Sequence, residues 1–156
     1  NSTFLNAVGS MGEVVMVLQP WRAPVPLTRV WCIFEAYAAE ATRSRFSVAM
    51  TEREACDLVA AICEDPSALL GTLRRVCCEA SSATQAEDRE RIFDTVRQSV
   101  GFAQLNGMVA ARMMEAVCVE LHSHPDAASA AWAPRLQALA QLRGLQRNYA
   151  EAERLH

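Results

Sequence analysis

The chain has 156 residues, the size of one ordinary domain, and 51% of them are hydrophobic while 21% are charged. This composition is typical of a folded globular protein and excludes a largely disordered or collagen-like chain. The formal net charge of −3, with no clustered basic surplus, argues against a protein that binds the phosphate backbone of nucleic acid.

The first third of the chain alternates helical and strand patterns. Residues 4–8 are typical of a helix end, and the apolar run 13–19 predicts a central strand of a parallel sheet, covered on both faces. A proline-rich loop occupies 20–26. Apolar residues at helical spacing over 27–41 predict a helix packed on the sheet, and 45–50 alternates like a second strand.

The middle of the chain is mainly helical. Capping-box patterns open predicted helices over 51–63 and 84–101, and an Asp-Pro pair at 65–66 opens a short one. The segment 75–79 indicates a short third strand. A longer amphipathic helix is predicted over 102–121.

The pattern breaks near residue 122, so we place an α/β domain at 1–121, a linker at 122–133 and a helical segment at 134–156. That last segment predicts two helices joined by a turn at 146–148. The first domain is expected to have a flavodoxin-like parallel sheet flanked by helices. Three strands are few for such a sheet, which usually has about four to six, so we expect further strands upstream of Asn1.

Several site classes are not indicated by the sequence. The longest apolar run is far shorter than the roughly 20 residues of a membrane helix, so no membrane partner is expected. The six cysteines form no Cys-x-x-Cys pair, which favours reduced thiols and a cytoplasmic protein. His122 and His124 have no third ligand at metal spacing, so we predict no metal site.

The junction 19–35 is the best candidate for a functional site, because ligands of open α/β sheets bind beyond the carboxyl ends of strands. On a helical projection Trp31 lies about 40° and Glu35 about 80° from the centre of the core-facing side, with Thr28 and Cys32 on the same flank. A partly shielded carboxylate suits acid–base chemistry or stabilisation of a sugar cation. The simpler alternative is a solvated or ion-paired helix residue.

Two resemblances start from this junction. The apolar strand, the Pro-Trp pair that follows it and residues 26–35 resemble a domain of kinesin-light-chain-like tetratricopeptide-repeat proteins of algae and oomycetes. The helix is also similar to the Trp-Cys-x-x-Glu element of plant-type Toll/interleukin-receptor (TIR) domains. The TIR resemblance implies an NAD-cleaving activity with Glu35 as catalytic residue and Trp31 and Cys32 packed beside it. Those domains tend to have two serines where this chain has Thr28 and Arg29.

The C-terminal segment resembles a tetratricopeptide repeat of the kinesin-light-chain kind. The matching residues are Leu136, Leu139, Ala140, Tyr149, Ala152 and Leu155, with 148–153 as the start of the second helix. Arg147 replaces the usual glycine of the turn. The match spans about two-thirds of a 34-residue repeat and implies further repeats after His156; a plain helical hairpin is the alternative.

Two functions remain open. The first is a signalling or scaffold protein, in which a TIR-like domain is joined to a tetratricopeptide array that binds protein partners, with self-association as a further expectation. The second is an NAD-cleaving hydrolase that uses Glu35, with Thr28, Trp31 and Cys32 near the substrate. NAD is then a substrate, no cofactor is required, and these 156 residues alone are expected to be inactive.

Overall fold

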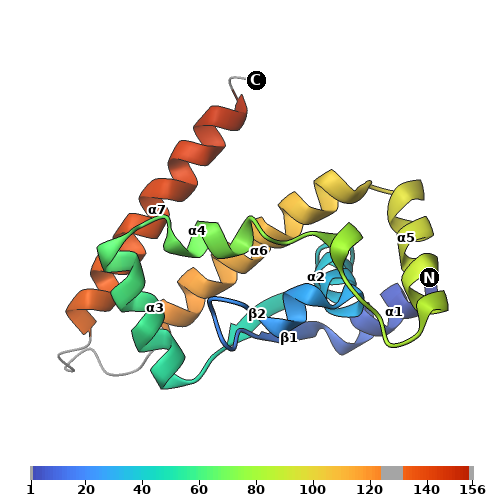
Figure 1. Ribbon diagram of the computed structural model, residues 1–156, viewed down its shortest axis with the longest axis horizontal. Helices are drawn as coiled ribbons and strands as arrows, with labels where there is room; N and C mark the ends of the chain where they lie inside the picture. The colour runs from blue at the N-terminus through green and yellow to red at the C-terminus, as the bar shows by residue number, and fades with distance from the viewer. Residues whose placement is uncertain (1, 124–131, 155–156) are drawn as a thin grey trace.

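The computed structural model describes residues 2–123 and 132–154, which form a mainly helical protein with a small parallel sheet (Figure 1). The elements in chain order are α1 (Ser2–Met11), β1 (Glu13–Val17), the 3-10 helix η1 (Val25–Thr28), α2 (Val30–Thr42), β2 (Arg45–Ala49), α3 (Glu52–Glu64), α4 (Ala68–Leu73), the 3-10 helix η2 (Cys78–Ala80), α5 (Ala86–Gln98), α6 (Phe102–His122) and α7 (Trp132–Arg154).

The sheet is one β1–α2–β2 crossover unit. The strands run parallel with Glu13 opposite Arg45 and Val17 opposite Ala49, so the two strands predicted near these positions are confirmed. Met16 of β1 is buried, as are Phe46 and Val48 of β2. The prediction that both faces of the first strand are covered is wrong, because Val15 and Val17 are 56% and 53% exposed.

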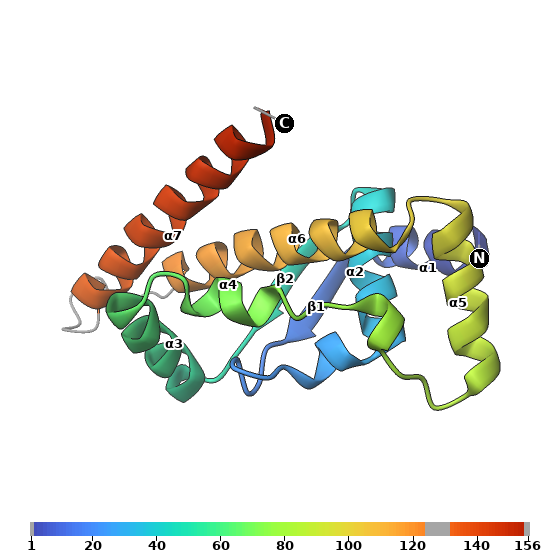
Figure 2. The same cartoon turned by 45° about the horizontal axis from the view of Figure 1, so that its top comes forward.

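Helix α6 organises the core. It runs the length of the molecule, with α5 at one end and α3 and α7 at the other (Figures 1 and 2). Its buried side chains recur every three to four residues and include Leu105, Val109, Met113 and Val117. These residues join β2, α2 and α4 into a single buried cluster, as the amphipathic pattern predicts.

The predicted strand at 75–79 is wrong. This segment turns into η2, and Ser81 N donates to the Cys78 carbonyl while Cys78 N donates to the Asn106 side chain at 2.9 Å. Val76 and Cys78 are buried while Cys77 is exposed, which explains why the sequence alternates like a strand. The backbone N–H groups of Arg75, Val76 and Cys78 bond to Thr72, Leu73 and the Asn106 side chain, and in the described part of the chain no strand pairs with this segment.

The helix predicted over 27–41 begins three residues later in the structure. Val25–Thr28 forms η1, and α2 begins only at Val30, after Arg29 in an extended conformation. The proline at position 26 leaves one backbone donor fewer, which suits a tight single turn.

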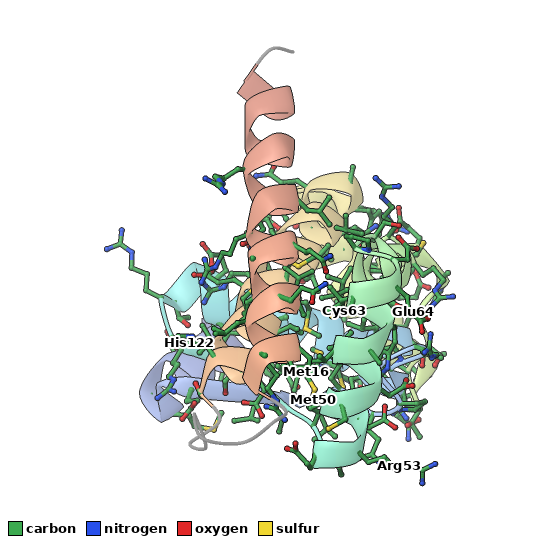
Figure 3. The ribbon with its side chains drawn as sticks, turned by 90° about the vertical axis from the view of Figure 1, so that its left-hand side faces the viewer. Met16, Met50, Arg53, Cys63, Glu64 and His122 are labelled. Carbon is green, nitrogen blue, oxygen red and sulfur yellow. The ribbon has the colours of Figure 1, made fainter. Side chains whose placement is uncertain are left out.

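The turn predicted at 146–148 is wrong as well, because α7 is one continuous helix over Trp132–Arg154. With Arg147 in place of glycine, neither glycine nor proline interrupts the helix there. Ala138 and Leu142 of α7 belong to the same buried cluster as α3 and α6, while the C-terminal part of α7 extends beyond the other helices (Figure 3).

The division into two domains stays a prediction. Residues 124–131 of the predicted linker lie outside the described residues, as do Leu155 and the side chains of Tyr149 and Ala152. Within the described residues, no helix combines the length and apolar character needed to cross a bilayer.

Candidate functional site

The loop after β1 is fastened to α3 through Trp21. The backbone N of Trp21 donates to Glu54 Oε2 at 2.8 Å, and its indole Nε1 donates to Asp57 Oδ2 at 2.6 Å. The Arg22 guanidinium lies 4.4 Å from the indole centroid and 3.2 Å from Asp57 Oδ2. The indole hydrogen bond is the main reason why the pKa of Asp57 lies below its usual value.

A second set of contacts holds the other side of this loop. Arg75 Nη2 donates to the Arg22 carbonyl, and Thr72 Oγ1 donates to the same oxygen at 3.5 Å. A cavity of about 410 Å³ adjoins this point and is lined by Trp21, Arg22, Asp65, Ser67, Ala68, Gly71, Thr72 and Arg75. Several of its polar side chains already bond to the protein, so we interpret the cluster mainly as a device that positions the loop.

The sequence located this loop but not its partners. Glu54 and Asp57 lie 33 and 36 residues beyond Trp21. The sequence indicated Glu54 only as part of the capping box that begins α3. In the structure Thr51 Oγ1 accepts from Glu54 N at 3.3 Å, which confirms that cap. The Glu54 carboxylate then points to Trp21 N instead of closing the box.

Thr28 is a turn residue in the structure. Its hydroxyl donates to the Val25 carbonyl at 2.8 Å, and its own carbonyl accepts from Ser82 N at 2.9 Å. Val30 N donates to the Ser82 carbonyl at 2.9 Å, so the start of α2 is tied to the segment before α5. These bonds give Thr28 a structural role at the helix start.

Trp31 faces α1 and α5. Its ring centroid lies 5.2 Å from that of Phe4, and its Nε1 donates to Asp88 Oδ2 at 3.3 Å. A cavity of about 470 Å³ lies beside it, lined by Thr3, Phe4, Ala7, Trp31, Arg91 and Ile92. Glu35 is not among the residues that line this cavity, so the structure does not bring Trp31 and Glu35 to one shared pocket there.

Cys32 and Glu35 occupy half-buried positions one helical turn apart on α2. Burial, and then the Glu35 charge, raise the pKa of the Cys32 thiol, which makes it a poor nucleophile at neutral pH. Burial also raises the pKa of the Glu35 carboxyl. Among the described residues Glu35 has no hydrogen-bond or ion-pair partner, so the ion-paired alternative is not what the structure has.

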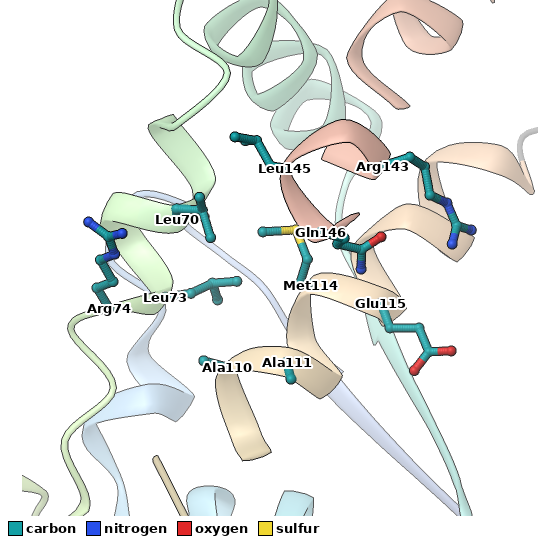
Figure 4. A pocket seen from close by; sticks show the side chains of 10 residues that line it. All are labelled: Leu70, Leu73, Arg74, Ala110, Ala111, Met114, Glu115, Arg143, Leu145 and Gln146. Carbon is teal, nitrogen blue, oxygen red and sulfur yellow. The ribbon is translucent and has the colours of Figure 1, made fainter. Parts of the chain in front are cut away.

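A third surface was not indicated by the sequence: a groove between α4, α6 and α7 (Figure 4). Its volume is about 440 Å³, and it is lined by Leu70, Leu73, Arg74, Ala110, Ala111, Met114, Glu115, Arg143, Leu145 and Gln146. In Figure 4 the side chains of Leu70, Leu73 and Met114 lie between the helices, and Leu145 closes the α7 side. We call this the α4–α6–α7 groove.

The described residues contain no group of three or more His, Cys, Asp or Glu side chains placed to hold a metal ion. All six cysteines are free thiols. His124, one of the two histidines weighed as ligands, lies outside the described residues.

Comparison with protein-family models, with curated proteins and with solved structures finds no match to this chain.

Proposed function

We propose that the chain is an interaction module of a signalling or scaffold protein and that the α4–α6–α7 groove binds an amphipathic helical segment of a partner protein. The observation that carries the proposal is the groove itself, in which leucine, methionine and alanine side chains from three helices line an open volume of about 440 Å³. Apolar grooves between helices are the usual receptors for the apolar face of a partner helix.

The charge at the rim suggests which helix would bind. Arg143 of α7 lines the groove, and Glu115 is the one acidic residue among the described residues that line it. Glu115 lies 3.4 Å from Arg112, so part of its charge is balanced within α6. A partner helix with leucines at helical spacing and acidic flanking residues therefore has the complementary charge.

The sequence resemblances suggest what the rest of the protein contains. We infer that the β1–α2–β2 unit belongs to a TIR-like domain and that α7 leads toward tetratricopeptide repeats that bind further partners. The parallel crossover and the Trp-Cys-x-x-Glu element on its helix support the first inference. The second rests on the sequence pattern alone, since α7 has no turn at the predicted position.

The groove can be tested with a designed probe. The probe is a fluorescein-labelled peptide helix with leucines at positions i, i+3, i+4 and i+7 and glutamates beside them. Fluorescence anisotropy should show saturable binding that weakens by about tenfold or more in Leu145→Glu. Leu136→Glu is the matched control, because Leu136 is on the same helix, 45% exposed and outside the groove lining. Equal affinity for both variants, or no saturable binding, would refute the proposal.

A second function, cleavage of NAD at the nicotinamide–ribose bond, is favoured by one observation. Glu35 is half-buried, has no charged partner among the described residues, and has a raised pKa. In this proposal its carboxylate stabilises the ribosyl cation in the full-length protein, which supplies the remainder of the pocket.

The test of this second function is release of nicotinamide from NAD by the full-length protein and by Glu35→Gln, which keeps the side-chain shape. Loss of release in the variant supports the role of Glu35. Release at background level from the unaltered protein removes the proposal.

A further inference from the structure

Helix α7 carries one wall of the α4–α6–α7 groove but is held to the protein by an earlier part of the helix. Among its described side chains, the buried ones lie within residues 135–142, and its main neighbours are α3 and α6 (Figure 3). We call the contact of residues 135–142 with α3 the α3–α7 joint. The lining of the groove on α7 begins only after it, at Arg143. The position of this wall therefore depends on how the joint is held.

The α3–α7 joint contains a buried charge, that of Arg135, which is only 3% exposed. Its Nη2 donates to Oε1 of Glu52, in the first turn of α3, at 2.5 Å. Its Nη1 is also buried and has no hydrogen-bond partner among the described residues. Arginine is almost never buried to this degree unless it is paired, and removing one member of a buried ion pair leaves the other charge uncompensated. The docked position of α7 therefore depends on the carboxylate of Glu52.

The length of α7 turns a small rotation at the joint into a large shift at the groove. Leu145 lies ten residues beyond Arg135 on one continuous helix, which is about 15 Å at the rise of an α-helix. A rotation of α7 by about 10° about Arg135 would move Leu145 by roughly 2.5 Å. A gap of about 1 Å already forfeits up to about half of the dispersion energy of a packed contact. The fit of a helix in the groove is therefore sensitive to the angle of α7.

We propose that Arg135 is a positioning residue of the α4–α6–α7 groove, and that its ion pair with Glu52 sets the angle of α7 at which the groove accepts a helix. This role rests on the proposed binding of a partner helix. Neither Arg135 nor Glu52 lines the groove, so both act through the position of α7. Because coupling between two sites is reciprocal, a helix bound in the groove also stabilises the α3–α7 joint.

The first test is Glu52→Gln, which removes the counter-charge of Arg135 and keeps the shape of the side chain. The affinity of the folded protein for the leucine–glutamate probe peptide should fall by about tenfold or more. A merely structural role would lower stability and leave the affinity of the folded protein unchanged, so urea unfolding is followed in parallel to give the folded fraction. Without peptide, hydrogen exchange of the amides of residues 138–142 should become about tenfold faster in this variant.

A double variant separates a lost position from a lost fold. Glu52→Gln combined with Arg135→Met replaces the buried cation by an apolar side chain, and such replacements of buried ion pairs are often neutral or stabilising. The double variant should bind the probe within about twofold of the unaltered protein and show its slow amide exchange. Glu64→Gln is the matched control, since it makes the same chemical change at an exposed residue of the same helix and should change neither property.

The outcomes distinguish the role of Arg135 from the proposed function. If the unaltered protein does not bind the probe, the helix-binding function fails, and amide exchange alone decides the joint: faster exchange of 138–142 in Glu52→Gln that the double variant reverses supports its role in holding α7. If the unaltered protein binds, equal affinity in Glu52→Gln, or a double variant that stays weak, would overturn the positioning role. Equal exchange of 138–142 in Glu52→Gln and the unaltered protein would overturn it in either case.

Discussion

Replacing Phe34 by alanine should lower the free energy of unfolding by about 4 kcal/mol. Phe34 is 1% exposed on α2, and its ring centroid lies 5.5 Å from that of Phe4, 6.5 Å from Trp31 and 5.6 Å from Tyr37. Phe→Ala changes in cores cost about 3 to 5 kcal/mol. Three aromatic neighbours, each worth about 0.5 to 1.5 kcal/mol beyond area burial, place this position away from the low end of the range.

The loss can be measured by urea unfolding followed by circular dichroism, with the slope m unchanged and the midpoint lowered. Val25→Ala is the control: Val25 is 58% exposed and should change stability by less than about 0.5 kcal/mol. Because Phe4 belongs to α1, the amides of α1 should also exchange faster in the Phe34 variant. A loss below about 1.5 kcal/mol would show that the four rings do not form a packed joint between α1 and α2.

Three further predictions follow from single positions. Burial raises the pKa of Glu35, so the protonated carboxyl stabilises the folded state fully below the unfolded-state pKa, and this stabilisation is lost as pH rises through the folded-state pKa. Glu35→Gln should therefore raise the urea midpoint at neutral pH and leave it unchanged below about pH 4. Trp21→Phe removes the indole donor, and the pKa of Asp57, followed by NMR titration, should rise toward its ordinary 3.8, whereas an unchanged pKa would contradict the hydrogen bond. Gly101 has a φ of 74°, so Gly101→Ala should lower the free energy of unfolding by about 1 kcal/mol. Gly107 lies inside α6 with open space around it, so Gly107→Ala should raise that free energy by up to about 1 kcal/mol. Thermal unfolding measures both changes, and equal effects of the two variants would refute the role given to the backbone conformation of Gly101.

The spacing of apolar residues correctly predicted the helices that bury one apolar side against the core. The helix after β1 and the long helix α6 were found because their apolar residues recur at helical spacing. The segment 75–79 was misassigned because alternating burial does not reveal whether a neighbouring strand exists. The turn at 146–148 was expected from the sequence pattern of the C-terminal segment, yet the residues there have ordinary helical propensity and α7 continues through them.

The candidate site shows the same limit. A helical projection predicted that Glu35 flanks the buried side of α2, and the structure confirms its half-buried position. The hydrogen bonds from Trp21 to Glu54 and Asp57 were missed because they join residues more than 30 positions apart, and no local pattern encodes such a contact. The α4–α6–α7 groove was missed for the same reason, since its lining comes from three helices distant in sequence.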